Sequence, residues 1–132
     1  MITRIISGVL LVLLLMGCQT LSERKQADKL QEVLRNYQGV IRWGSIDQAR
    51  RFLKPETSGE VMTKPVGQTR VTHYEVVQGP SMVEDNKAIQ TAVIQYVFVD
   101  SQVVREVVDQ QTWEFDPQTE RWYLISPPPH FK

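Results

Sequence analysis

The segment KAIQTAVIQYVFV, residues 87–99, determines the architecture that we predict for this chain. It is rich in β-branched and aromatic residues, which favour a strand. In a strand, alternate side chains face opposite sides, yet both faces are partly apolar here. One face holds Ala88, Gln90, Ala92, Ile94, Tyr96 and Phe98, and the other holds Ile89, Thr91, Val93, Gln95, Val97 and Val99.

A sheet with one solvated face would alternate more cleanly, and a single helix can cover only one face. We therefore predict that the second face contacts another protein, either a second copy or a different chain. The predicted partner face consists of Thr91, Val93, Gln95 and Val97. The alternative is that β-branched residues stand there for strand propensity alone.

Three further strands are predicted around this segment. They cover residues 70–78, 103–115 and 121–126, and short polar turns separate them. Gly79-Pro80 is expected to end the first of them, and Pro127-Pro128-Pro129 to end the sheet. Strands joined by short turns are typical of antiparallel neighbours, so we expect a four-stranded meander.

Two helices are predicted before the sheet. Apolar residues recur at helical spacing from Ala27 to Ile41, and Thr20 and Glu23 have the spacing of a capping box. A helix is therefore expected from about residue 21 to Gly44, followed by a shorter one at residues 45–54. Residues 55–68 are predicted to form a loop with a short extended stretch at Val61-Met62. The predicted fold class is α+β, with two N-terminal helices on a curved four-stranded antiparallel sheet.

Composition excludes several classes of function. The 132 residues carry 15 Lys+Arg against 15 Asp+Glu, so the chain has no basic excess for nucleic acid. One cysteine cannot form an internal disulfide or a Cys-rich zinc site, and two isolated histidines do not make a metal centre. We therefore expect no metal, no cofactor and no nucleic-acid partner.

The N-terminus has the pattern of a secretory signal peptide. Arg4 is followed by residues 5–16, a run of 12 that is apolar except for Ser7 and Gly8. Such a run is too short for a transmembrane helix, which needs ~20 residues. An N-terminal anchor that is never cleaved is the alternative.

Leu15-Met16-Gly17-Cys18 resembles a bacterial lipobox. The resemblance implies cleavage between Gly17 and Cys18, a diacylglyceryl group on the Cys18 sulfur and acylation of the new amino terminus. Several acyl chains make such an anchor stable. Gln19 in place of Asp favours the outer membrane and its periplasmic face, with surface display left open. The expected organisation is a signal peptide at 1–17, a lipidated cysteine and short tether at 18–20, and a domain at 21–132.

The domain resembles the NTF2-like (cystatin-like α+β) family. The resemblance depends on Arg42-Trp43-Gly44 before a short helix with Ala49, on Gln111-Thr112-Trp113, and on Arg121-Trp122-Tyr123. More narrowly, the chain is similar to small proteobacterial outer-membrane lipoproteins whose NTF2-like domain has no assigned function. The implied fold is a cone between helix and sheet, whereas fold alone does not imply function.

The resemblance also extends to NTF2-like isomerases and dehydratases, which work in that cone. Such an isomerase needs a Tyr and two inward carboxyl groups. Tyr37 lies on the appropriate helix, but Asp100, Asp109 and Asp116 fall near turns or beside polar neighbours. We therefore expect Tyr37 to be a core residue whose hydroxyl reaches the rim. His73 is the best single acid–base candidate, with a solvated strand position as the favoured alternative.

Trp43, Trp113 and Trp122 could form an aromatic platform for a ligand, although we expect large apolar bodies with satisfied indole N–H groups. Tyr37, His73 and Trp43 are thus the weak cone or rim candidates. The sequence predicts a non-enzymatic, lipid-anchored module that forms a homodimer or binds an envelope protein. The alternative is a small-molecule cone or an isomerase- or dehydratase-like enzyme.

Overall fold

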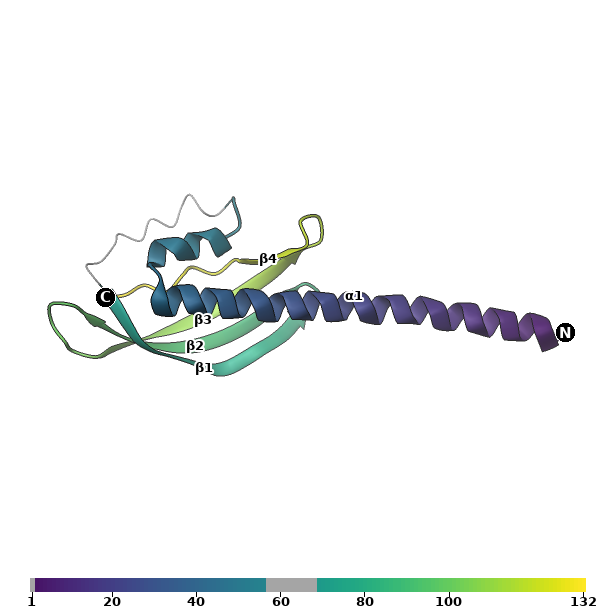
Figure 1. The fold of residues 1–132 in the computed structure, drawn as a ribbon, viewed down its shortest axis with the longest axis horizontal. Coiled ribbons are helices and arrows are strands. Elements are labelled where there is room, and N and C mark those ends of the chain that lie inside the picture. Colours follow the sequence, from purple (N-terminus) through teal and green to yellow (C-terminus); the bar gives the residue numbers. More distant parts are fainter. Residues whose placement is uncertain (1, 57–68) are drawn as a thin grey trace.

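The computed structural model describes residues 2–56 and 69–132, with side chains within 21–56 and 69–132. The predicted stretch at Val61-Met62 lies outside these residues. Two helices precede a four-stranded antiparallel sheet of order β1-β2-β3-β4, which confirms the α+β class (Figure 1). The elements are α1 (Ile2–Trp43), η1 (Ile46–Phe52), β1 (Thr69–Glu84), β2 (Lys87–Phe98), β3 (Arg105–Asp116) and β4 (Arg121–Leu124).

Helix α1 is longer than predicted. It runs without a break from Ile2 to Trp43, so the helix start predicted at Thr20 and Glu23 is wrong. The expected tether at residues 18–20 is likewise helical. A capping box acts only where a helix begins, and here the apolar run upstream is itself helical. In the described part of the chain, no helix has the length and apolarity needed to cross a membrane.

The chain reverses after α1 as predicted. Gly44 follows the helix, and its N–H donates to the Val40 carbonyl at 2.8 Å. The second element, η1, is a 3₁₀ helix of 7 residues and not an α-helix. Ser45 is its N-cap, and the Ser45 side chain makes no capping hydrogen bond. Its apolar residues Ala49 and Phe52 are buried as expected.

Strand β1 extends beyond its predicted end. Gly79-Pro80 does not terminate it, because pairing with β2 resumes at Ser81↔Ile89 and continues to Glu84↔Lys87. The register shifts between Gln78 and Ser81, and this irregularity accommodates the Gly-Pro pair. Proline is tolerated because β1 is an edge strand that needs ladder bonds on one side only.

The core lies between α1 and the inner face of the sheet (Figure 1). Ala88 and Ala92 of β2 are fully buried there. Tyr37, Phe52 and Trp113 form edge-to-face contacts at 5.4–6.3 Å between ring centroids. Aromatic side chains therefore fill the space between helix and sheet.

The C-terminal tail contributes to this core. Pro127-Pro128-Pro129 follows the last strand as predicted, and Phe131 then packs on Tyr96 at 4.7 Å between ring centroids. The Tyr96 hydroxyl donates to the Lys132 carbonyl at 2.8 Å and accepts from the Lys132 N–H at 3.1 Å. The tail is thus docked and not merely a strand terminator.

The predicted partner face is less exposed than expected. Thr91, Val93 and Gln95 are partly buried, and Val97 is buried. Val108 of β3, which pairs with Val93, lies on the same face and is 54 % exposed. Three further exposed valines, Val99, Val103 and Val104, lie in the connection between β2 and β3.

Candidate functional site

A carboxyl group is buried between helix and sheet. Asp109 lies on β3 and is 2 % exposed. Gln111 and Trp113, two and four residues further along the strand, are buried on the same side, as the period of two requires. The sequence predicted no inward pair of Asp side chains, and of the three Asp residues considered the structure buries only Asp109.

Five side chains surround Asp109 in one hydrogen-bonded network. The Tyr37 hydroxyl donates to Asp109 Oδ2 at 3.2 Å, and Gln111 Nε2 donates to the same oxygen at 2.8 Å. Gln111 connects the other members, because its Nε2 also lies 2.8 Å from the Tyr74 hydroxyl. Its Oε1 accepts from Gln90 Nε2 at 3.3 Å and from Trp113 Nε1 at 3.1 Å. Among the described side chains, no buried polar atom lacks a partner.

Burial dominates the ionisation of this network. It raises the pKa of Asp109 from its ordinary value of 3.8 to about 6, although hydrogen bonds from Gln111 and Tyr37 work in the opposite direction. Burial also raises the pKa of Tyr74 to about 12 and that of Tyr37 well above 10, the latter with help from the charge on Asp109. No ion pair to Asp109 is found in the described part of the chain, so only these hydrogen bonds offset the cost of its charge there.

The geometry does not match the isomerase arrangement. A substrate oxyanion would need the Tyr37 hydroxyl proton, which is directed at Asp109, and Tyr37 is fully buried. A second inward carboxyl group is missing from the described network, since Asp100 is exposed and Asp116 accepts a bond from the Gln118 N–H at 2.9 Å. No metal-binding group of three or more His, Cys, Asp or Glu occurs within the described residues.

One cavity does reach Asp109. It has a volume of about 470 Å³ and lies between β3 and the C-terminal tail. Tyr96, Asp109, His130 and the three prolines are among the residues that line it. The exposed Glu106 also lines it, so a small molecule with a hydrogen-bond donor or a positive charge would find a carboxylate there.

A larger groove of about 920 Å³ lies between α1, η1 and β4. Phe52 and Trp122 are buried residues of its lining, and Trp43, which is 79 % exposed, lies at one end. Its charged residues are Lys29, Glu32, Arg35, Arg51, Glu120 and Arg121. Among the lining residues cations therefore exceed acids by two, whereas the whole chain has no net charge.

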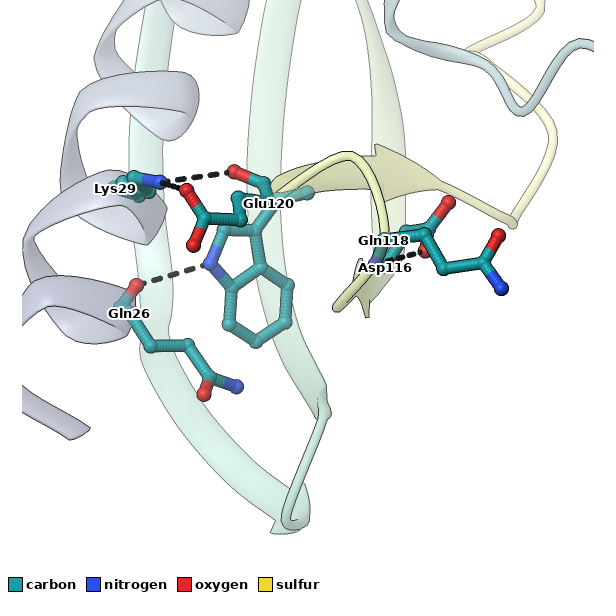
Figure 2. Close-up of polar contacts among 6 residues, drawn as sticks. Gln26, Lys29, Asp116, Gln118 and Glu120 are labelled. Atoms are coloured by element: carbon teal, nitrogen blue, oxygen red, sulfur yellow. Dashed lines mark hydrogen bonds and ion pairs between the residues drawn. The ribbon is translucent and has the colours of Figure 1, made fainter. Parts of the chain in front are cut away.

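An ion pair fixes one end of the groove. Lys29 Nζ lies 3.3 Å from Glu120 Oε2 and 3.2 Å from the Glu120 carbonyl oxygen (Figure 2). Nearby, the Trp122 indole N–H donates to the Gln26 carbonyl at 3.0 Å. These contacts fasten the β3–β4 turn to α1 and hold the groove open along the helix.

The structure separates the three residues predicted for a cone or its rim. Tyr37 is buried as expected, but its hydroxyl binds Asp109 and does not reach the rim. His73 faces away from the core, is exposed and lies 3.9 Å from Glu75, which agrees with the favoured solvated position. Trp43 is exposed beside the groove, with Arg42 4.4 Å from its ring, whereas Trp113 and Trp122 have the expected buried role.

The comparisons with known proteins returned no relatives. No family model, no curated protein and no solved structure matches this chain. The function must therefore be argued from the groove, the buried network and the N-terminal pattern.

Proposed function

We propose that the protein is a lipid-anchored envelope module that binds a partner protein. The anchor is a lipid on Cys18, and the proposed location is the periplasmic face of the outer membrane. The domain would be a member of the NTF2-like group with a filled cone. The observation that supports this function best is that α1 carries both the lipobox-like segment and one wall of the groove.

The continuous helix makes the proposed anchor rigid. Among the helix residues whose side chains are described, Gln26 is the first that bonds to the sheet region, through the Asp85 carbonyl at 3.0 Å and through Trp122. Gln26 lies eight residue steps from Cys18 along the helix, which is about 12 Å at 1.5 Å per residue. The domain would then stand at a fixed distance from the membrane instead of moving on a loose tether.

The same geometry orients the domain. Figure 1 shows α1 leaving the sheet at the end where the β3–β4 turn lies, with the connection between β2 and β3 at the opposite end. Anchoring at Cys18 would therefore direct the exposed Val99, Val103 and Val104 away from the membrane. The groove, parallel to α1, would remain accessible from the side.

Replacing the anchor residue tests this proposal. We expect Cys18→Ser to move the protein from the membrane fraction to the soluble fraction or to leave the leader uncut, because the thioether cannot form. Mass spectrometry of the wild-type protein should find the N-terminus at Cys18 with added acyl mass. A photo-crosslinker at Trp43 should capture a protein partner in native membranes, whereas one at the exposed Arg24, on α1 outside the groove, should not. An unmodified Cys18 sulfur, or equal capture at both positions, would contradict the proposal.

A second candidate function is the binding of a small molecule at the cavity beside the tail. The buried Asp109 with its raised pKa favours it, because such groups are concentrated at functional sites. At pH 7.5 we expect benzylamine to raise the melting temperature of the wild type and not that of Asp109→Asn. Neutral benzyl alcohol serves as the matched control. The absence of any difference between the two ligands would eliminate an ionic site at Asp109.

A further inference from the structure

We propose that the groove between α1, η1 and β4 binds an extended acidic peptide segment of a partner protein, which adds as a strand to the edge of β4 that pairs with no other strand of the described sheet. This inference depends on the proposed binding function and names its ligand. It does not require the lipid.

The first argument is charge. Arg35 and Arg121 line the groove, are exposed, and have no ion-pair partner in the described part of the chain. Arg51 lies 5.5 Å from the Phe52 ring on the η1 side. Positive groups therefore border the groove on all three of its elements, and they complement carboxylates of a ligand.

The second argument is the open strand edge. β4 is the last strand of the sheet, and four consecutive residues, 120–123, line the groove although their side chains alternate between faces. A groove lined in this way runs along the edge of the strand. The described residues cover that edge only through the single parallel bridge Leu53↔Leu124. Edges of this kind accept peptide strands through main-chain hydrogen bonds.

The third argument is Gly39, which lies within α1 and lines the groove. Glycine inside a helix is unfavourable relative to alanine. Packing does not require it here, because a Cβ at Gly39 would meet nothing within 4 Å. A residue that is unfavourable for the helix is expected at a binding surface, because the missing side chain of glycine leaves space for a ligand.

The dimensions suit a short peptide. The helical wall of the groove extends from Lys29 to Trp43, which is 14 residue steps or about 21 Å. An extended chain covers that length in roughly six or seven residues at ~3.3 Å each. A phosphate group or a sugar polymer would satisfy the arginines but could not continue the sheet, so the open edge favours a peptide.

Fluorescence anisotropy with the full lipidated chain in detergent tests the proposal. The probe is a labelled eight-residue peptide that alternates Glu and Val, and its controls are the Lys/Val analogue and a backbone N-methylated Glu/Val analogue. We expect the Glu/Val peptide to bind and each control peptide to bind at least tenfold more weakly. Equal binding of the N-methylated peptide, or full competition by dextran sulfate at equal charge concentration, would overturn strand addition.

Matched variants locate the site. Arg35→Glu with Arg121→Glu should weaken binding of the Glu/Val peptide at least tenfold, whereas Arg24→Glu, on an exposed part of α1 outside the groove, should leave it unchanged. Gly39→Trp should block the groove, and Gly39→Ala should raise the melting temperature without loss of binding. Circular dichroism confirms folding of each variant. If both the double variant and Gly39→Trp still bound the Glu/Val peptide, the groove would not be its site. Peptide binding by Cys18→Ser would show that the groove works without the lipid, so the two proposals can fail separately.

Discussion

Asp109→Asn should stabilise the protein at neutral pH by up to about 3 kcal/mol. The reason is that the folded state raises the pKa of this carboxyl group from 3.8 to about 6, a difference of roughly two units at 1.36 kcal/mol each. Asparagine has nearly the same shape and keeps an oxygen that can accept from Tyr37 and Gln111. It removes the buried charge and retains most of the network.

The sign of the pH dependence follows from proton binding. Between about pH 4 and pH 6 the folded protein holds a proton on Asp109 that the unfolded chain has already lost. Stability therefore falls as pH rises through this window, and the loss is complete above the folded pKa. Asp109→Asn removes this contribution, so it should match the wild type near pH 4 and exceed it increasingly up to pH 7.

Urea unfolding at half-unit pH steps measures the effect. The difference in unfolding free energy between variant and wild type isolates Asp109, because the other carboxyl groups are common to both. Asp100→Asn is the control, since Asp100 is exposed in a turn and should give a flat difference near zero. A flat difference for Asp109→Asn as well would show that the carboxyl group is not buried in solution.

The sheet was predictable because strand alternation and turn residues are local signals. The segment at residues 87–99 forms β2 almost as predicted, and its alternate residues Ala88, Ala92 and Ile94 are buried. The end of β1 was not predictable in this way. Pro80 breaks a strand only where both edges need hydrogen bonds, and the edge position of β1 is a property of the assembled sheet.

Asp109 was missed because local polarity suggests a solvated position. Its neighbours on the same side are Gln111 and Trp113, and a row that alternates Asp, Gln and Trp resembles an exposed face with one aromatic residue. The sequence signal for its burial was the alternation of strand residues between the two faces of the sheet. Trp113 was expected to be buried, and the period of two then places Asp109 on the buried side. Tyr37 and Asp109 are 72 residues apart, so no local pattern could pair them.

The groove, like the contact between Tyr37 and Asp109, joins segments that are far apart in the sequence. Its walls come from α1, η1 and β4, and none of these segments has an anion-binding motif of its own. The sequence signal was aromatic, since Trp43 and Trp122 were considered for a ligand platform and both line the groove. The packing of the β3–β4 turn against the helix through Lys29 and Glu120 is a tertiary contact between residues 91 positions apart.

Phe131→Ala should destabilise the protein by about 3–5 kcal/mol, as is usual for a buried phenylalanine. Its ring is 8 % exposed and packs on Tyr96, while the Lys132 carbonyl accepts hydrogen bonds from Tyr96 and from Arg105 at 3.0 Å. Losing the ring leaves a cavity and frees the tail, and both effects lower the free energy of unfolding. Total stabilities of ~5–15 kcal/mol make such a loss large.

The adjacent His130→Ala is the matched control, because His130 is exposed and should change the unfolding free energy by less than about 0.5 kcal/mol. The three prolines explain why so short a tail can dock. Their fixed φ angles limit the conformations of the free tail and so reduce the entropy lost when Phe131 is placed. Replacing residues 127–129 by Gly-Ser-Gly should therefore also destabilise the protein while leaving Phe131 intact. Equal stabilities of wild type and Phe131→Ala in urea would mean that the tail is not docked on β2.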